Sequence, residues 1–213
     1  MRFRFTQRQR LSWRAILWAC LAAAVPSAAT AADVMRVEED WQLVVNQPDA
    51  NLNGPQLTCV IAPASADQGY CAFDLNYNTQ PGYAAGGLQM HLWNPSQPIV
   101  VGDFPVSGVM QQPNETVTWT QTMSINQGVL SFAVKNGQSA TWGGFDNSAS
   151  PLLAMTTATN LNSYDPNVSL NNSGVCFASN LVTSLTLNAV RWYAADGTLI
   201  AQVTTPQTVH PQD

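Results

Sequence analysis

The sequence predicts an all-β protein in which two antiparallel sheets pack face to face as a β-sandwich or jelly roll. Three observations favour this class. Apolar and polar residues alternate with a period of two in many short segments, turn-forming residues recur about every 8–12 residues between them, and no segment shows the period of an amphipathic helix. A closed barrel is the alternative arrangement for so many short strands.

Residues 1–31 have the pattern of a secretory signal peptide. Five arginines form a basic head, an apolar run follows at 15–25, Pro26 ends that run, and small residues precede Ala32. We expect cleavage after Ala31 and one β-sandwich domain at 32–213, secreted or placed in the periplasm or at the cell surface. A lipoprotein signal acylated at Cys20 is the alternative.

The charge of the chain changes once this leader is set aside. Residues 32–213 hold three Lys and Arg against 13 Asp and Glu, a net charge of −10. Nucleic acids and anionic lipids need clustered cations, so we expect neither as a partner. The leader contains the most apolar run, and no later run of about 18 apolar residues predicts a membrane span.

Four strands are expected in the first half of the chain, and the last of them shows the alternation most clearly. In that strand Leu88, Met90 and Leu92 alternate with Gln89, His91 and Trp93, so one face is apolar and the other is polar and aromatic. The four segments are 40–46, 57–61, 70–77 and 86–94.

The second half of the chain continues the same pattern. Prolines flank 98–104 and indicate an edge strand, and a threonine ladder marks one face of 115–125. Asn136–Gly137 and Asp196–Gly197 are hairpin signals. Residues 160–174 are expected to form a loop, and no helix is expected. The further strands are 129–135, 139–145, 152–159, 175–178, 181–194 and 198–203.

Three cysteines follow the leader, in a compartment where disulfides form. A hairpin centred on residue 65 would place Cys59 opposite Cys71, so we expect a Cys59–Cys71 disulfide with Cys176 as a buried free thiol. Three unpaired, buried cysteines are the alternative.

Aromatic residues on a polar face suggest a carbohydrate-binding surface. Trp and Tyr rings stack on sugar rings, and amide side chains hydrogen-bond to hydroxyl groups. Trp93 shares a face with His91 and Gln89, and Trp142 lies in the turn-like segment 141–145. These four residues are the candidate ligand-binding set, although packing against loops is the alternative for both tryptophans. Trp41 and Trp119 lie on apolar faces and are expected in the core.

A structural calcium ion is the one cofactor that the sequence suggests. Asp74, Asn76 and Asn78 would place three oxygen-bearing side chains along one strand face. The segment is not an EF-hand loop, because Thr79 and Ala85 replace the required Gly and Glu. A second candidate group consists of Asp146, Asp165 and Asn167.

Catalytic motifs are scarce. His91 and His210 are the two histidines, and no Gly-x-Ser-x-Gly motif follows the leader, so a nucleophilic triad and a zinc site are not predicted. A polysaccharide hydrolase would need paired carboxylates, for which Glu38, Asp40 or Asp74 are the candidates. The acidic ladder Glu-x-Asp-x-x-Glu of jelly-roll glucanases is not completed here, because Leu43 takes the last position.

The segments Asp40–Val45, Phe73–Asn76, Gly86–Trp93 and Thr141–Gly143 resemble landmarks of uncharacterised secreted bacterial proteins with a concanavalin-like jelly-roll pattern. That resemblance implies a fold but no activity. We expect a non-catalytic secreted β-sandwich that binds carbohydrate or a cell-envelope component. The alternatives are a structural or assembly protein of the cell surface and a polysaccharide-active hydrolase. The oligomeric state is not predicted.

Overall fold

A computed structural model describes residues 32–47, 55–64, 69–75, 88–94, 97–104 and 112–211. Contacts divide the chain into residues 1–31 and 32–213, and the described residues all belong to the second unit. The described residues form two antiparallel sheets, one α-helix and a short 3-10 helix, so the all-β expectation is confirmed. No helix in these ranges is long and apolar enough to cross a membrane.

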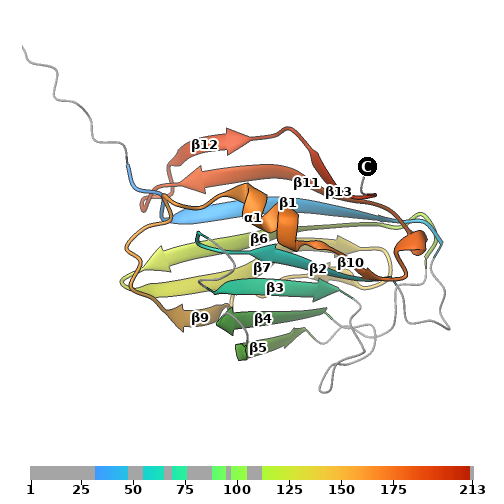
Figure 1. Ribbon diagram of the computed structural model, residues 1–213, viewed down its shortest axis with the longest axis horizontal. Helices are drawn as coiled ribbons and strands as arrows, with labels where there is room; N and C mark the ends of the chain where they lie inside the picture. Colours follow the sequence, from blue (N-terminus) through green and yellow to red (C-terminus); the bar gives the residue numbers. More distant parts are fainter. Residues whose placement is uncertain are drawn as a thin grey trace, which may run out of the picture. The chain divides into compact units, whose positions relative to one another are not determined.

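The larger sheet has eight strands and forms one layer (Figure 1). Its main path runs β12-β11-β1-β6-β7-β8, with β13 also paired to β11 and β9 also paired to β7. β1 lies near the middle because it pairs with both β11 and β6. The strands are β1 (Arg36–Val45), β6 (Thr116–Asn126), β7 (Val129–Ser139), β8 (Gly143–Phe145), β9 (Leu152–Met155), β11 (Val182–Tyr193), β12 (Leu199–Val203) and β13 (Gln207–His210).

The second layer consists of a five-stranded sheet and the helix α1 (Pro166–Asn172), which lies beside β2 (Figure 1). The order of this sheet is β10-β2-β3-β4-β5, so β5 is an edge strand as predicted. A 3-10 helix, Ser179–Leu181, leads from β10 into β11. The strands are β2 (Gln56–Ile61), β3 (Tyr70–Leu75), β4 (Leu88–Asn94), β5 (Gln97–Phe104) and β10 (Gly174–Phe177).

The core lies between the layers and follows the period of two. Alternate residues of β1, from Val37 to Val45, face inward and are buried, as are their partners on β6. Trp41 and Trp119 are directly opposite each other, with stacked rings whose centroids are 6.4 Å apart, and Phe73 packs on Trp119 from the other sheet. The prediction that both tryptophans are core residues is confirmed.

The helix α1 corrects the expectation of a helix-free loop at 160–174. Asp165 caps the helix by accepting a hydrogen bond from the Asn167 backbone N–H, and Pro166 occupies the first turn, where its missing N–H costs nothing. The helix is only seven residues long, so it shows no clear amphipathic period. Ser169 is buried on the inner side of the helix.

Asn136–Gly137 is a β-bulge rather than the expected turn. Asn136 has φ 55°, and the pairing of β7 with β6 shifts there, yet the strand continues to Ser139. The predicted strand 139–145 is therefore reduced to β8, and the predicted strand 152–159 ends at Met155. The hairpin turn at Asp196–Gly197 is confirmed by Gly197, whose φ is 86°. β13 was not predicted.

The expected Cys59–Cys71 disulfide is wrong. The β2–β3 hairpin pairs Cys59 with Phe73 and Ile61 with Cys71, so the two cysteines share a face but are offset by two residues, and both are free thiols. Burial raises the pKa of both thiols, which keeps them protonated and unreactive. Cys176 is exposed rather than buried.

Candidate functional site

The polar face of β4 is buried to a degree that the sequence did not predict. Gln89 and His91 are only 3% and 2% exposed, so the expectation that they face solvent is wrong, whereas Trp93 is half-buried. Asp74 lies opposite Gln89 on β3 and is also buried. Of the three β4 residues in the candidate ligand set, only Trp93 therefore has surface available to a ligand.

Asp74 organises this face through hydrogen bonds. One carboxylate oxygen accepts a hydrogen bond from the Thr58 hydroxyl, and the other lies 3.0 Å from His91 Nδ1. The exposed Cys176 thiol donates to Thr58 Oγ1 over 3.5 Å. The thiol is connected to the histidine only through Thr58 and Asp74. This series of hydrogen bonds therefore does not have the geometry of a Cys–His nucleophile. These hydrogen bonds link β2, β3, β4 and β10.

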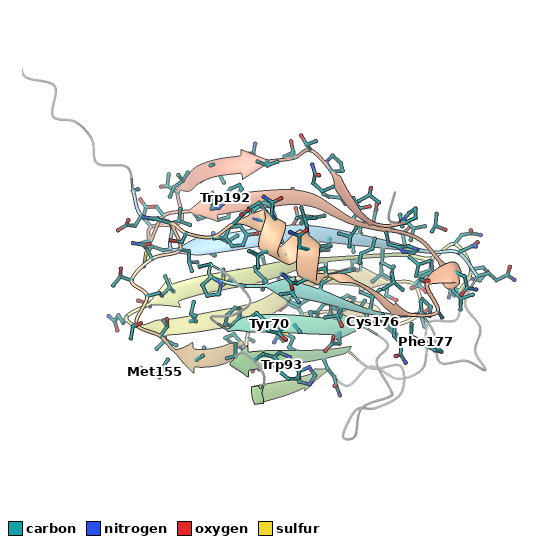
Figure 2. The ribbon with its side chains drawn as sticks, viewed as in Figure 1. Tyr70, Trp93, Met155, Cys176, Phe177 and Trp192 are labelled. Carbon is teal, nitrogen blue, oxygen red and sulfur yellow. The ribbon has the colours of Figure 1, made fainter. Side chains whose placement is uncertain are left out.

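Trp93 lines a groove of about 480 Å³ where β4 meets the β7–β9 region of the larger sheet. Its ring stacks on Tyr70, with centroids 6.1 Å apart and an interplanar angle of 13°, and lies tilted against His91. Figure 2 shows Tyr70 and Trp93 next to each other on β3 and β4. Apolar residues and threonines share the remaining lining, which consists of Pro63, Gly69, Leu92, Leu130, Phe132 and 154–158.

Trp142 does not join Trp93 in a common surface. It follows the end of β7, whereas the groove contacts β7 at Leu130 and Phe132, roughly 20 Å away along the strand. Trp142 packs against the core, and its backbone N–H donates to Ser139 Oγ. The buried Glu115 accepts from Ser139 and Thr141 and fixes this turn, so the position of Trp142 is a packing position.

The outer face of the larger sheet carries an ion-pair network. Glu38 and Asp40 share this face, as their spacing predicted, and Arg191 contacts both: Nη1 lies 2.5 Å from Asp40 Oδ2, and Nη2 lies 3.5 Å from Glu38 Oε2. Lys135 and Arg36 also contact Glu38, at 2.6 and 3.1 Å. All three cations that follow residue 31 thus gather around two carboxylates.

A depression of about 380 Å³ opens beside this network. It lies between two β-bulges, one at Asn136–Gly137 in β7 and one at Asn188 in β11, where the pairing with β1 shifts between Asp40 and Trp41. Bulges often lie next to binding sites because they redirect side chains. The lining of the depression combines charged, amide and hydroxyl groups with parts of two tryptophans. It consists of Asp40, Trp41, Thr118, Trp119, Thr120, Asn136, Asn188 and Arg191.

Asp40 is held rigidly at the edge of this depression. Arg191 donates two parallel hydrogen bonds to its carboxylate, of 2.5 and 2.7 Å, and Thr120 Oγ1 donates a third of 2.8 Å. Partial burial opposes ionisation, but the hydrogen bonds from Arg191 and Thr120 outweigh it and lower the pKa of Asp40. Asp40 is therefore a fixed carboxylate at neutral pH.

Glu39 points the other way, into the sandwich, where it is completely buried. Trp41 Nε1 donates to Oε2 over 2.8 Å, and the Tyr164 and Ser169 hydroxyls donate to Oε1. Burial raises the pKa of Glu39 to about 7, against the opposing effect of these three hydrogen bonds. Tyr164 and Ser169 belong to the segment around α1, so Glu39 joins that segment to β1.

None of the candidate carboxylates Glu38, Asp40 and Asp74 is free of partners: Arg191 contacts both Glu38 and Asp40, which share a face. A glycosidase needs a protonated acid and an ionised carboxylate on either side of one bond. Glu39, whose pKa is raised, and Asp40, whose pKa is lowered, lie on opposite faces of the sheet because they are consecutive in β1. Asp74 is buried on the other sheet and bound to Thr58 and His91.

The predicted calcium sites receive no support from side-chain grouping. Asn76 and Asn78 lie outside the described residues. One oxygen of Asp74 accepts from Thr58, and the other lies against His91 Nδ1. Asp146 accepts bonds from Ser148 and Asp165 caps α1. Within the described ranges, no group of three or more His, Cys, Asp and Glu side chains could hold a metal ion.

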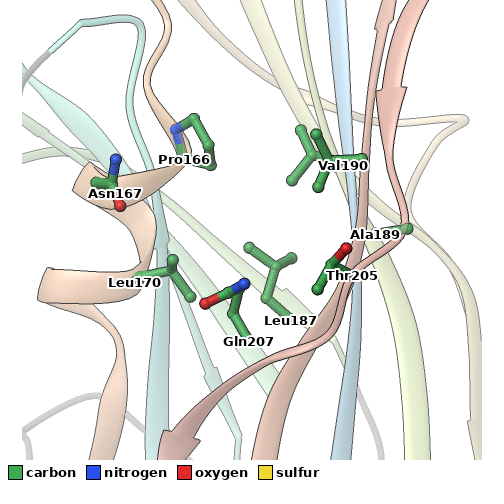
Figure 3. Close-up of a pocket in the computed structure, with 9 residues that line it drawn as sticks. Pro166, Asn167, Leu170, Leu187, Ala189, Val190, Thr205 and Gln207 are labelled. Atoms are coloured by element: carbon green, nitrogen blue, oxygen red, sulfur yellow. The ribbon is translucent and has the colours of Figure 1, made fainter.

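A third cavity lies between α1 and the edge of the larger sheet. Figure 3 shows Pro166 and Leu170 of α1 facing Leu187 and Val190 of β11. Its volume is about 200 Å³, which is smaller than the roughly 300–1,000 Å³ of typical ligand pockets. The two larger sites are therefore the better candidates.

Sequence reasoning missed the partners Arg191, Lys135, Tyr164 and Ser169. A signal for the first two was present, because three cations in a segment with 13 acidic residues are expected to be paired with carboxylates. No comparable signal marked Tyr164 or Ser169.

Comparison with known proteins adds no assignment, because no protein-family model and no curated protein matches the chain.

Proposed function

We propose that the chain is an exported, non-catalytic binding protein, built as a concanavalin-like jelly roll, that binds a carbohydrate of the cell envelope in the Trp93 groove. The observation that carries this proposal is the groove itself, whose volume of about 480 Å³ fits the usual range of ligand sites. Export is supported by the signal-like sequence of residues 1–31.

The groove suits a sugar because its lining is amphipathic. Pyranose rings present C–H faces that pack on aromatic and aliphatic side chains, and hydroxyl groups that need polar partners. Trp93, Met155 and Ala158 supply the first kind of surface, and Thr156 and Thr157 supply the second. Stacking on Tyr70 fixes the Trp93 ring, which reduces the entropy lost on binding.

The test is a glycan array and an insoluble-polysaccharide pull-down with the purified protein and two variants. Trp93→Ala should abolish binding while leaving the far-ultraviolet circular dichroism unchanged. Trp142→Ala is the matched control, since it removes the same ring at the other end of β7 and should leave binding intact. Binding that survives Trp93→Ala, or the absence of any glycan bound by the unaltered protein, would refute the proposal.

Assembly at the cell surface is the second candidate function, and β12 is the observation that favours it. This strand ends the larger sheet, holds no charged residue, and exposes Leu199, Ile200 and Val203 to 45%, 40% and 46%. An uncharged, apolar edge strand is a surface on which another strand can add. Concentration-dependent sedimentation that is lost in Ile200→Lys would support assembly of copies of this chain, and a monomer at all concentrations would exclude it.

A further inference from the structure

We infer that the depression on the outer face of the larger sheet is a second binding site, and that its ligand is a carboxylated saccharide such as a uronic acid unit. This site is separate from the Trp93 groove, which involves the five-stranded sheet and the β7–β9 region. The inference does not depend on the function proposed for that groove.

The local charge of this surface differs from that of the rest of the chain. Residues 32–213 carry a net charge of −10, yet this surface gathers all three of their Lys and Arg side chains around Glu38 and Asp40, and the exposed Asp146 lies nearby, bonded to the Asn136 backbone N–H. The side chains of Arg36, Lys135 and Arg191 are 39%, 29% and 23% exposed, whereas the Glu38 side chain is 6% exposed. Solvent therefore meets three cations and the ion-paired Asp40, whose side chain is 32% exposed, above the buried Glu38. In a strongly acidic chain this gathering of cations favours an anionic ligand.

Lys135 has hydrogen-bond donors to spare for a ligand. The Lys135 ammonium has three N–H donors, of which one bonds to Glu38 Oε1 at 2.6 Å. Lys135 lies opposite Thr120 in the β6–β7 pairing, next to Asn136 at the rim of the depression. Its remaining donors can bond to a ligand carboxylate without breaking the ion pair.

The depression also offers polar partners for the hydroxyl groups of a sugar. Asp40 is an oriented acceptor, because Arg191 and Thr120 fix its carboxylate. The two bulges add the amides of Asn136 and Asn188, which can both donate and accept. Amides, a fixed carboxylate and hydroxyls around a depression of about 380 Å³ provide the mixed polar contacts that a polyol needs, beside the cations that select a carboxylate.

The experiment is isothermal titration calorimetry of the purified protein at low ionic strength, with three probes. An oligogalacturonate carries the sugar ring and the charge, its methyl ester keeps the ring without the charge, and sodium acetate supplies a carboxylate without the ring. We expect measurable binding of the oligogalacturonate only, weakening as sodium chloride is raised from 50 to 500 mM. Equal binding of the ester, or no binding of the oligogalacturonate at millimolar concentration, would overturn the inference.

Two variants test the location. Lys135→Gln should weaken oligogalacturonate binding about five- to tenfold, the range for one charge-assisted hydrogen bond, and Lys135→Arg should largely retain it. Asn188→Asp leaves every ion pair intact and adds a negative charge to the lining, so it should weaken binding by a similar factor. Unchanged affinity in both Lys135→Gln and Asn188→Asp would overturn the inference.

Two controls separate this site from other causes. Asn180→Asp adds the same charge at an exposed position of the 3-10 helix, roughly 20 Å along the chain from Asn188, and should leave affinity unchanged. Trp93→Ala should also leave oligogalacturonate binding unchanged, because the groove is a different site. Loss of this binding in Trp93→Ala would place the ligand in the groove and refute the second site.

Discussion

Glu39 and Asp40 are consecutive residues of β1 with opposite electrostatic surroundings. Asp40 points outward, where two hydrogen bonds from Arg191 and one from Thr120 lower its pKa. Glu39 points inward, where burial raises its pKa to about 7. The period of two along a strand therefore decides the ionisation of a carboxyl group as well as its exposure.

The two residues also connect different parts of the molecule. Asp40 and its neighbour Glu38 join β1 to β7 and β11 through Lys135 and Arg191, within one sheet. Glu39 joins β1 to Tyr164 and Ser169, and so holds the α1 segment against the larger sheet. The outer network is partly exposed and screened by salt, whereas the inner cluster is buried, so we expect inner substitutions to have the larger effects.

Glu39→Ala should give the largest loss of stability. It removes the acceptor of three buried donors, from Trp41, Tyr164 and Ser169, and leaves a cavity. We expect the free energy of unfolding in urea to fall by about 3–4 kcal/mol. Glu39→Gln is the control, since it keeps an acceptor of nearly the same shape and should cost much less. Equal losses in the two variants would show that the hydrogen bonds contribute little.

The pH dependence of stability should show the raised pKa of Glu39 directly. The unfolded chain loses this proton near pH 4.5, whereas the folded chain keeps it up to about pH 7. Between these values the folded state binds more protons, so Glu39 lowers the free energy of unfolding as pH rises, by about 3 kcal/mol in total. The measurement is the difference between the unaltered protein and Glu39→Gln from pH 4 to 8. Parallel curves would contradict the raised pKa.

The sequence predicted the outer carboxylates better than the inner one. The alternation of apolar and polar residues around Trp41 predicted the strand. The spacing of Glu38 and Asp40 predicted that both side chains lie on one face, as the structure confirms. Glu39 was not among the predicted residues, because a carboxyl group at a core position interrupts the hydrophobic pattern that defines the strand. Its burial depends on Tyr164 and Ser169, 125 and 130 residues away in the chain, and local sequence carries no information about such partners.

The other errors have similar causes. The β2–β3 register depends on the connection between the strands, so an offset of two residues left Cys59 and Cys71 on one face but not opposite each other. Asn136–Gly137 has the same local conformational preference in a bulge as in a hairpin turn, and only the pairing of β7 with β6 distinguishes the two. The burial of Gln89 and His91 is likewise a tertiary property that alternation along β4 does not contain.

Arg191→Gln should have an intermediate effect on stability. Asp40 loses both of its guanidinium hydrogen bonds, while Glu38 retains Lys135 and Arg36. We expect the free energy of unfolding to fall by about 1–2 kcal/mol at 50 mM sodium chloride, and by less at 500 mM because the network is partly exposed. Arg191→Lys keeps the charge but not the paired hydrogen bonds, and should recover part of the loss. A loss that is independent of salt would indicate packing rather than charge.

Asp40→Asn should have the smallest effect, and its pH dependence should be opposite in sign to that of Glu39. The pKa of Asp40 is lowered below its ordinary value of 3.8, so its contribution is present above that value and is lost as pH falls through the folded pKa. Because the side chain is 32% exposed, we expect less than about 1 kcal/mol at pH 7. Urea denaturation of both proteins from pH 7 down to 3 measures the difference, which should shrink toward the acid end. A difference that grew in acid would mean that Asp40 is held protonated, and neighbouring positions of β1 would then not have opposite electrostatics.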